Sequence, residues 1–200
     1  MPPAHHTAAP GQRRRRADAE RSVARILDSA VDALASDPEA SMAEIARRAG
    51  VVRATIYVHF PTRDALIDAV TRRAIAEATA TIKAAEPERG DAADALNRVV
   101  VSAWRTLERY HALVAINTQL PQAELHARHR PVLAILEPLI ERGQRDGSFR
   151  SDVPAAWHLS MVMALIHAAS GELQAGRVPE QHAEAALSAT VLGAVRAGPS

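Results

Sequence analysis

The sequence predicts an all-α protein with two parts, an N-terminal three-helix unit and a C-terminal helical bundle. Hydrophobic residues make up 48% of the 200 residues and aromatic residues only 3%, so packing must rest on Ala, Leu, Val and Ile. Apolar residues recur at steps of three and four, as on one face of a helix, and the alternation typical of strands is scarce. A chain of this length can bury a core in one or two small domains.

Composition excludes several classes of protein. The chain has no cysteine, which excludes disulfides and thiolate metal sites. No apolar run reaches membrane-spanning length, and residues 1–16 lack the apolar core of a signal peptide, so we expect a cytoplasmic protein. The net charge of +1 says nothing about partners, but basic residues cluster at Arg13–Arg16, Arg47–Arg48, Arg53 and Arg63.

The chain begins with a predicted disordered basic arm over residues 1–17, which contains Pro, Gly, His and Arg but no apolar period. The Arg13–Arg16 run is either a solvated tail or an arm that reaches into a minor groove or along phosphates. A helix with one apolar face follows the arm. Pro38 ends this helix, because the residue before a proline is disfavoured in helical backbone.

Three helices are predicted around Gly50 and after it. Ser41 and Glu44 have the spacing of a capping box, which marks the start of a short helix. Gly50 separates this helix from the next, which ends before Pro61. Thr62 is a suitable N-cap for the helix that follows. The three predicted ranges are 41–49, 51–59 and 62–85.

The second half of the sequence predicts five more helices and no strand. Asp91 caps the first of them, and Pro131 and Pro138 lie inside the third, where we expect them to bend the axis. The predicted ranges are 91–107, 111–120, 123–145, 154–174 and 180–196. The boundary between the two parts falls near residue 65.

The segment around Gly50 has the pattern of a helix-turn-helix. This motif needs a small residue where the helices cross, a turn residue that tolerates positive φ, and a branched apolar residue that packs back. Ala46, Gly50 and Ile56 occupy these places. Glycine suits the turn because it adopts left-handed backbone without a Cβ penalty.

The outer face of the helix after Gly50 carries Arg53, Thr55, Tyr57 and His59, with no acidic residue before Asp64. A helix that lies in a DNA groove needs such donors without carboxylates, because phosphates repel carboxylates. The alternative is a plain three-helix core with a solvated polar face.

One segment resembles the N-terminal DNA-binding domain of the TetR family of bacterial transcriptional regulators. This segment is SMAEIARRAGVVRATIYVHFPTRDALIDAV. The run Thr-Ile-Tyr-x-His-Phe, followed by a small polar, a basic and an acidic residue, is characteristic of that domain. The similarity covers residues 20–70. The remainder matches only in layout, as an all-helical regulatory domain of the usual length.

The resemblance implies that residues 52–59 form a recognition helix in the major groove. Arg53 would pair with guanine, and Ala54 and Val58 would touch thymine methyl groups. Thr55 would reach a base or a phosphate.

The resemblance also implies phosphate contacts on both sides of the base-reading residues. Tyr57 and His59 match positions of the recognition helix that contact phosphate. Ser41, Thr62 and Arg63 match phosphate clamps at the starts of two neighbouring helices, where free N–H groups favour anions.

Two positions depart from the family pattern. Val52 stands where Ser or Thr usually caps the recognition helix, which weakens the start of that helix by ~1 kcal/mol. Ala54 stands where Gly is usual, and it adds a methyl group that faces the groove.

The last two predicted helices, residues 154–174 and 180–196, suggest a dimer interface. Small residues let helices approach closely, as in a four-helix bundle. The last helix has an apolar stripe that comprises Ala183, Ala186, Leu187, Thr190, Val191 and Ala194. Either this stripe packs within its own chain, or, as the resemblance favours, it forms part of a symmetric homodimer interface. The two-fold symmetry of such a dimer would imply a near-palindromic operator.

A ligand pocket is expected between the helices after residue 75, with a few polar groups on an apolar lining. The candidate ligand-binding residues are Trp104, His111, Asn117, Met161, Met163 and His167. The alternative for each of them is an ordinary place in the core or an interface.

The sequence predicts no cofactor, metal or catalytic residue. Glu124, His126 and His129 have a spacing that can hold a metal, but solvated surface is the interpretation we favour. Glu108 and His111 give one Glu-x-x-His motif, whereas a di-iron bundle needs two. No Ser/His/Asp arrangement, P-loop or dinucleotide-binding glycine pattern is present.

We therefore predict a homodimeric, TetR-like regulator without catalytic activity. A helix-turn-helix DNA-binding domain (residues 18–64) would be joined to a helical-bundle ligand-binding and dimerisation domain (residues 65–200). An unknown small-molecule effector would release it, as a repressor, from double-stranded operator DNA. The alternative is a helical small-molecule or metal-binding protein that does not bind an operator.

Overall fold

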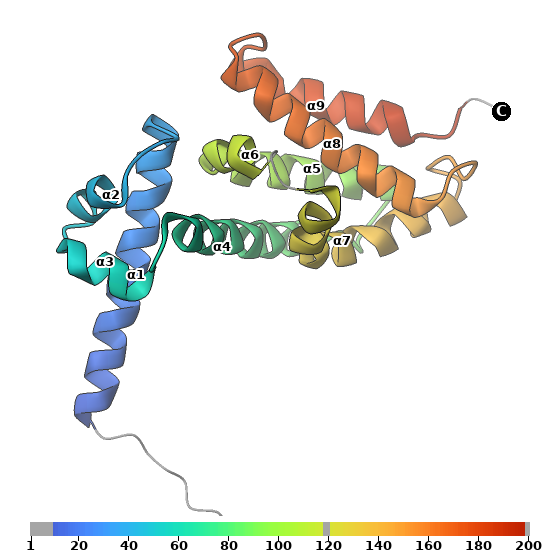
Figure 1. Ribbon diagram of the computed structural model, residues 1–200. Coiled ribbons are helices and arrows are strands. Elements are labelled where there is room, and N and C mark those ends of the chain that lie inside the picture. The colour runs from blue at the N-terminus through green and yellow to red at the C-terminus, as the bar shows by residue number, and fades with distance from the viewer. Residues whose placement is uncertain (1–9, 118–120, 199–200) are drawn as a thin grey trace, which may run out of the picture. The chain divides into compact units, whose positions relative to one another are not determined.

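The computed structural model of the chain describes residues 10–117 and 121–198 (Figure 1). These residues form α-helices, and their only strand-like contact is an isolated antiparallel bridge between Phe149 and Arg196. The chain divides into two compact units, residues 1–70 and 71–200. The division falls inside a helix, close to the predicted boundary at residue 65.

The first unit is built around a small apolar core. Ile26 and Leu34 of the first helix, Ile45 of the second and Ile56 of the third are all buried. The fourth helix adds Leu66 to the same set of buried side chains. The helices are α1 (Pro10–Ser36), α2 (Met42–Arg48), α3 (Arg53–His59) and the first turns of α4 (Arg63–Ala84).

Helix α1 begins earlier than the sequence predicted. It starts at Pro10, so the prediction of a disordered arm is wrong for residues 10–17, while residues 1–9 lie outside the described part of the chain. Proline is well suited to the first helical position, because the N–H it lacks has no partner there. Gln, Arg and Ala, which fill most of the next positions, have high helix propensity and extend a helix already formed by packing further along.

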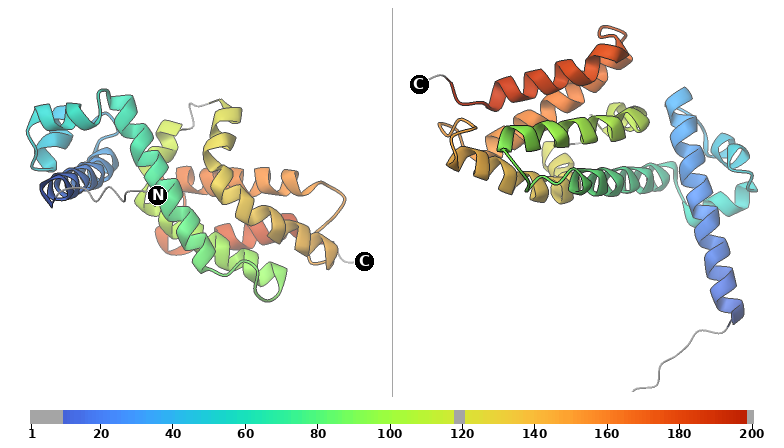
Figure 2. Two further views of the ribbon diagram at one scale, coloured as in Figure 1. Left: turned by 90° about the horizontal axis from the view of Figure 1, so that it is seen from below. Right: turned by 180° about the vertical axis from the view of Figure 1, so that it is seen from behind.

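The second unit contains the rest of α4 and five further helices (Figure 2). Helix α8 packs against both α7 and α9, and α5 packs against α7, α8 and α9. Trp104 and Phe149 are the largest fully buried side chains of this core. The helices are α5 (Ala92–Arg109), α6 (His111–Asn117), α7 (Gln122–Arg145), α8 (Ala155–Gln174) and α9 (Glu180–Val195).

Several local signals act as predicted. The Asp91 carboxylate accepts hydrogen bonds from the backbone N–H groups of Ala93 at 2.8 Å and Asp94 at 3.2 Å, which caps α5. Pro131 and Pro138 both lie inside α7, and the bend expected of them stays a prediction. Helix α6 was predicted to reach residue 120; its described part ends at residue 117, and residues 118–120 lie outside the description.

The loop between α4 and α5 is held by arginine side chains of the second unit. The Arg98 guanidinium donates to the carbonyl oxygens of Ala85 at 3.0 Å, Glu86 at 3.0 Å and Arg89 at 2.8 Å. Arg142 of α7 donates to the carbonyl of Pro87 at 2.9 Å. None of the helices described has both the length and the apolar character needed to cross a membrane.

Candidate nucleic-acid interface and internal pocket

The turn between α2 and α3 is fixed by backbone hydrogen bonds around a left-handed residue, a position that favours glycine. Gly50 has φ of +64°, and its N–H donates to the Arg47 carbonyl at 3.2 Å. The N–H of Val51 donates to the Ala46 carbonyl at 3.0 Å. These two bonds form a Schellman motif, in which the left-handed residue is usually Gly. The turn therefore sets the direction in which α3 leaves α2.

Helix α3 has one buried face and one outward face. Ile56 is fully buried, as the helix-turn-helix pattern predicts, and Phe60 fills a buried place at the end of the helix. On the outward face Val58 is 78% exposed and Tyr57 is 38% exposed, and Val52 just before the helix is 70% exposed. Neighbouring apolar side chains at such exposure make this face a candidate contact surface.

Arg53 is positioned by an aromatic ring and not by an acid. Its guanidinium carbon lies 5.6 Å from the centroid of the Tyr57 ring, one helical turn away. Within the described part of the chain Arg53 has no carboxylate partner. A guanidinium held in this way keeps its donors available for phosphate or a base edge.

The starts of α2 and α4 are capped by the predicted hydroxyl groups. Ser41 Oγ accepts from the N–H of Glu44 at 3.2 Å, and Thr62 Oγ1 accepts from the N–H of Ala65 at 3.1 Å. The Val52 side chain makes no cap hydrogen bond, which agrees with the expected weak start of α3.

The Glu44 side chain does not complete the predicted capping box. Its Oε1 accepts from Arg47 Nη2 at 2.6 Å and from Arg48 Nε at 2.9 Å. These two hydrogen bonds lower the pKa of Glu44 from 4.5 to about 2. Arg47 and Arg48, which looked like a free basic pair in the sequence, are therefore partly neutralised.

Arg63 has a different environment from the one its motif implies. Its guanidinium is half-buried and donates to the carbonyl oxygens of Pro38 and Ala40, the latter at 3.4 Å. These bonds hold the loop between α1 and α2. Part of the donor capacity that a phosphate clamp needs is already used inside the unit.

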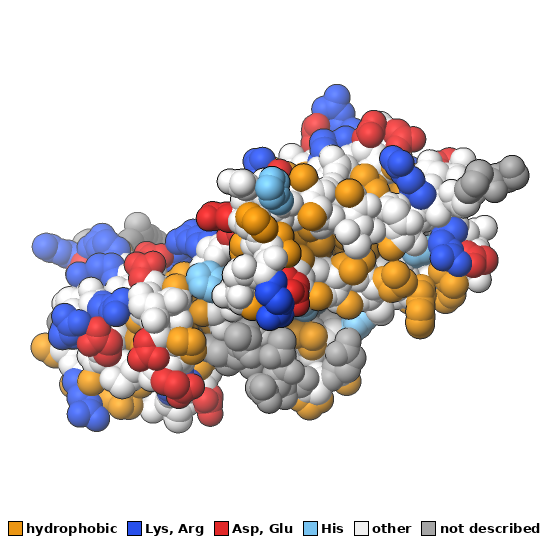
Figure 3. Space-filling view, turned by 90° about the horizontal axis from the view of Figure 1, so that it is seen from above, with side chains coloured by type: hydrophobic (Ala, Val, Ile, Leu, Met, Phe, Trp, Pro, Cys, Tyr) orange, Lys and Arg blue, Asp and Glu red, His pale blue; other side chains and the backbone are white. Residues whose placement is uncertain are grey.

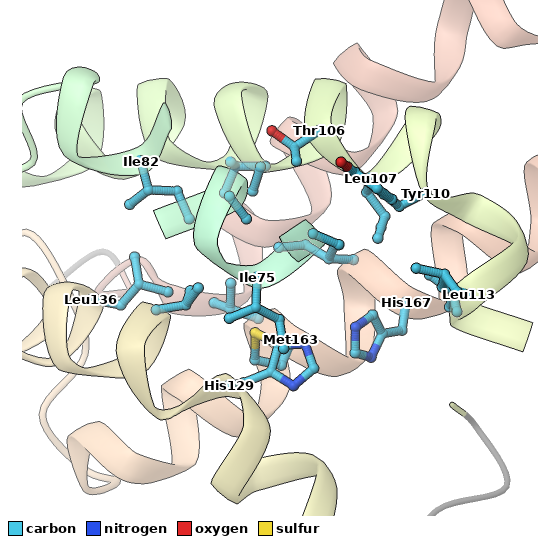
Figure 4. A pocket seen from close by; sticks show the side chains of 18 of the residues that line it. Ile75, Ile82, Thr106, Leu107, Tyr110, Leu113, His129, Leu136, Met163 and His167 are labelled. Atoms are coloured by element: carbon cyan, nitrogen blue, oxygen red, sulfur yellow. The ribbon is translucent and has the colours of Figure 1, made fainter. Parts of the chain in front are cut away.

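A cavity of about 110 Å³ lies inside the second unit, between α4, α5, α6, α7 and α8 (Figure 4). Its walls are mostly apolar. The labelled side chains are Ile75, Ile82, Thr106, Leu107, Tyr110, Leu113, His129, Leu136, Met163 and His167. A water needs roughly 10–15 Å³ in this measure, so the cavity has room for several waters or a small molecule.

Two hydroxyl groups on the cavity wall already have partners. Tyr110 Oη donates to Glu77 Oε2 at 2.6 Å, and burial together with this bond raises the pKa of the tyrosine. Thr106 Oγ1 lies 3.1 Å from Thr81 Oγ1 and also donates to the carbonyl of Ser102 at 3.2 Å.

Two histidines on the cavity wall face one another. The rings of His129 and His167 have centroids 5.5 Å apart and meet at 64°, in an edge-to-face arrangement. His129 Nδ1 lies 2.8 Å from the carbonyl of Leu125. Burial lowers the pKa of both histidines, that of His167 from 6.5 to about 4, so both rings are neutral at pH 7.

Comparisons with known proteins connect both features to one family. A family model described as bacterial regulatory proteins, tetR family, matches residues 26–70. The transcriptional repressor LfrR of Mycolicibacterium smegmatis is 40% identical over 83 residues, which are 42% of this chain and 44% of LfrR. A crystal structure of LfrR in complex with proflavine aligns with 90% of this chain and 99% of its own, with a TM-score of 0.69 and 26% identity.

The helix-turn-helix segment of the chain, residues 26–70, is similar to the TetR family of bacterial regulatory proteins. The family model covers the part of the chain that holds the helix-turn-helix, and the LfrR structure extends the likeness over both units. The transcriptional regulator NfxB of Pseudomonas aeruginosa is a further relative, 28% identical over 149 residues, which are 72% of this chain and 78% of NfxB. Both curated relatives are named as regulators of transcription.

The candidate ligand-binding residues divide between pocket and core. Met163 and His167 line the cavity, whereas Trp104 is buried in the core of the second unit and does not line it. The His111 ring lies against its own backbone, with Nδ1 2.8 Å from the carbonyl oxygen of Glu108. Neither His111 nor Met161 lines the cavity. The side chain of Asn117 lies outside the described part of the chain.

His129 is one of the polar pocket residues that sequence reasoning missed, together with Thr106 and Tyr110. It was weighed as a surface metal ligand beside Glu124 and His126, yet among the described residues no group of three potential ligands lies together. The signal was available in the sequence, because Leu125, His129 and Val132 share one helix face, and all three line the cavity.

The predicted interface stripe on α9 has two parts. Ala183, Leu187 and Val191 are buried within their own chain, which confirms the alternative interpretation for those three residues. Ala186 and Thr190 remain exposed. Figure 3 views the molecule from the side on which α8 and α9 lie uppermost, and hydrophobic and uncharged atoms cover much of that surface.

Proposed function

We propose that the protein is a dimeric transcriptional repressor that binds near-palindromic operator DNA in the cytoplasm and leaves it when a small molecule binds. The observation that carries the DNA half is the outward face of α3, where Arg53 is stacked near Tyr57 with no acidic partner among the described residues. The exposed valines beside it, Val52 and Val58, suit contact with thymine methyl groups.

The remaining DNA-contact assignments follow from the positions of the side chains. Ala54 and Tyr57 are exposed and Thr55 and His59 are half-buried on the same short helix, where they can reach bases or phosphates. Ser41 and Thr62 sit at the exposed starts of α2 and α4, where backbone N–H groups favour phosphate. We retain Arg63 only as a residue that positions the α1–α2 loop.

The effector half of the proposal rests on the cavity. It is apolar with a few polar groups, which is the usual character of a ligand site between helices. LfrR, whose name calls it a repressor, has been crystallised with proflavine. Helix α4 runs unbroken from Arg63 to Ala84, and its residues from Thr71 onward line the cavity. A shift of this helix on ligand binding is the simplest route from pocket to helix-turn-helix.

The test has two parts. Footprinting on DNA from upstream of the protein's own gene locates the binding site, and fluorescence anisotropy at several salt concentrations measures the affinity for it. We expect protection of one near-palindromic site, with affinity that falls steeply as salt rises. Arg53→Ala should weaken binding, whereas Arg89→Ala, which removes an exposed arginine from the second unit, should not. If the wild type binds all sequences equally and Arg53→Ala changes nothing, the protein is a helical small-molecule-binding protein without an operator.

A further inference from the structure

The chemistry of the cavity restricts the kind of effector that it can hold. None of the described residues that line it is Asp, Glu, Lys or Arg. The lining residue Tyr110 donates to the carboxylate of Glu77, which also accepts from Arg109 and is not itself part of the lining. A ligand with a full charge would therefore lose its hydration without meeting an opposite charge, which is strongly unfavourable.

Among the described lining residues, the two imidazoles are the hydrogen-bonding groups left for a ligand, because the third hydroxyl residue, Thr71, also has an interaction partner within the chain. The hydroxyl groups of Tyr110 and Thr106 have protein partners, as described above. His129 Nδ1 must donate to the Leu125 carbonyl, because a carbonyl oxygen only accepts, so the neutral ring presents Nε2 as an acceptor. His167 makes its ring contact with His129 and has no hydrogen bond within the described residues.

The polar groups are also placed unevenly. Figure 4 shows His129 and His167 near one another with Met163 beside them, while Ile82 and Leu136 lie at the other side of the cavity. A molecule that fills the space therefore meets hydrogen-bonding atoms at one end and only apolar side chains at the other.

We propose that the effector is an uncharged, mainly apolar molecule with one hydroxyl-like donor, which binds with this group at His129 and His167 and with its apolar body toward Ile82 and Leu136. The inference rests on the proposed effector function of the cavity, and it names the class of molecule. Permanent cations and carboxylate anions are disfavoured in the same space, because none of the described lining residues supplies a counter-charge.

The test uses three probes with one alkyl chain and different head groups: 1-octanol, octanoate and octyltrimethylammonium. Binding to the full-length protein is measured at pH 7.5 by isothermal titration calorimetry without DNA. We expect 1-octanol to bind at least about tenfold more tightly than either charged probe. Equal or tighter binding of a charged probe, or no binding of 1-octanol, would overturn the proposal.

Variants connect the preference to the histidines. His129→Leu and His167→Leu should each weaken 1-octanol binding about three- to tenfold, the usual size of one lost hydrogen bond. His167→Gln, which keeps polar amide atoms, should bind more tightly than His167→Leu. His126→Leu is the matched control, because His126 lies on the same helix but outside the cavity. Unchanged 1-octanol binding in both Leu variants would show that the histidines do not bind the hydroxyl group of the probe.

A separate measurement distinguishes this inference from the proposed function. Release of a labelled operator by 1-octanol is followed by anisotropy. If 1-octanol binds with the expected selectivity but leaves the DNA complex intact, the ligand class stands and the coupling to DNA is wrong. If the protein binds no operator at all, the calorimetric comparison still decides the ligand class.

Discussion

At the scale of single residues, two arginines that the resemblance assigns to DNA contact have different surroundings. Arg53 is exposed and lies over the Tyr57 ring, so its donors point to no protein acceptor that the structure describes. Arg63 is half-buried, and its guanidinium donates hydrogen bonds to the carbonyl oxygens of Pro38 and Ala40. Position in a motif therefore indicates a candidate contact, but the hydrogen bonds of the folded chain decide whether the side chain is available.

Arg53 and Tyr57 should differ in how they affect operator recognition. Arg53→Ala should cost about 1–3 kcal/mol at the preferred operator and remove discrimination at one base pair. Tyr57→Phe should weaken all sequences by a similar factor, because it removes one hydroxyl bond to phosphate. Anisotropy with operators altered at single positions measures both effects. Loss of base discrimination in Tyr57→Phe but not in Arg53→Ala would reverse the assignment.

Arg63 should act on stability more than on DNA affinity. Arg63→Ala removes bonds to two loop carbonyls and should lower the free energy of unfolding by about 1 kcal/mol. The slope of log affinity against log salt should stay at the wild-type value. Urea denaturation and salt titrations of operator binding test the two statements. A slope smaller by about one would identify Arg63 as a phosphate contact after all.

His167 should make stability depend on pH in the acidic range. Its pKa is about 4 in the folded chain, against 6.5 as the ordinary value, because of burial and the neighbouring His129. Between those pH values the unfolded chain binds more protons, so stability falls as pH decreases from 6.5 toward 4. The loss from this group is roughly 3 kcal/mol at most. Urea denaturation should show a shallower decline in His167→Leu, and an identical decline would contradict a buried neutral ring.

At the scale of helices and turns, local signals predicted the fold well. Thr62 and Asp91 cap the helices that they were expected to cap, and Gly50 has the left-handed backbone that the motif requires. Such signals depend on residues within a few positions of one another, so the sequence shows them directly. The start of α1 was the main error, because helix propensity at Arg-rich positions outweighed the missing apolar period.

Features that depend on distant segments could not be predicted in the same way. The pocket places His129 of α7 against His167 of α8, and no short-range pattern joins these positions. The α9 stripe likewise looked continuous until packing buried Leu187 and left Ala186 exposed. The candidate DNA contacts were found from the motif, whereas most of the pocket lining, apart from Met163 and His167, required the tertiary structure.

The turn at Gly50 should tolerate substitution poorly. Gly50→Ala places a Cβ on backbone with φ of +64°, which costs about 1–2 kcal/mol. No atom lies within 4 Å of that Cβ, so the cost is conformational and not steric contact with a neighbour. Gly50→Asn should lose less, because Asn accepts left-handed backbone more readily. Urea denaturation would contradict this account if Ala were as stable as Gly.

At the scale of the whole molecule, the main prediction is a homodimer formed through α8 and α9. The face of α8 presents small exposed residues at steps of three and four, namely Ser160, Ala164, Ala168 and Gly171. Trp157, which is 57% exposed, lies on the same face. Ala186 and Thr190 are exposed on α9, which packs against α8. Small residues allow close approach of a second helix pair, so these residues support a four-helix dimer interface.

The dimer is tested by its mass and by one charged substitution. Light scattering after size exclusion at micromolar concentration should give twice the 21.4 kDa of one chain. Ala164→Arg should produce monomers, because a guanidinium at the centre of a closely packed interface has no partner. Ala127→Arg, at an exposed position on α7, should remain dimeric.

Since two-fold symmetry is what makes a near-palindromic operator necessary, the monomeric variant should also bind a half-site and the full operator with similar affinity. A monomeric wild type would contradict both the interface and the operator symmetry.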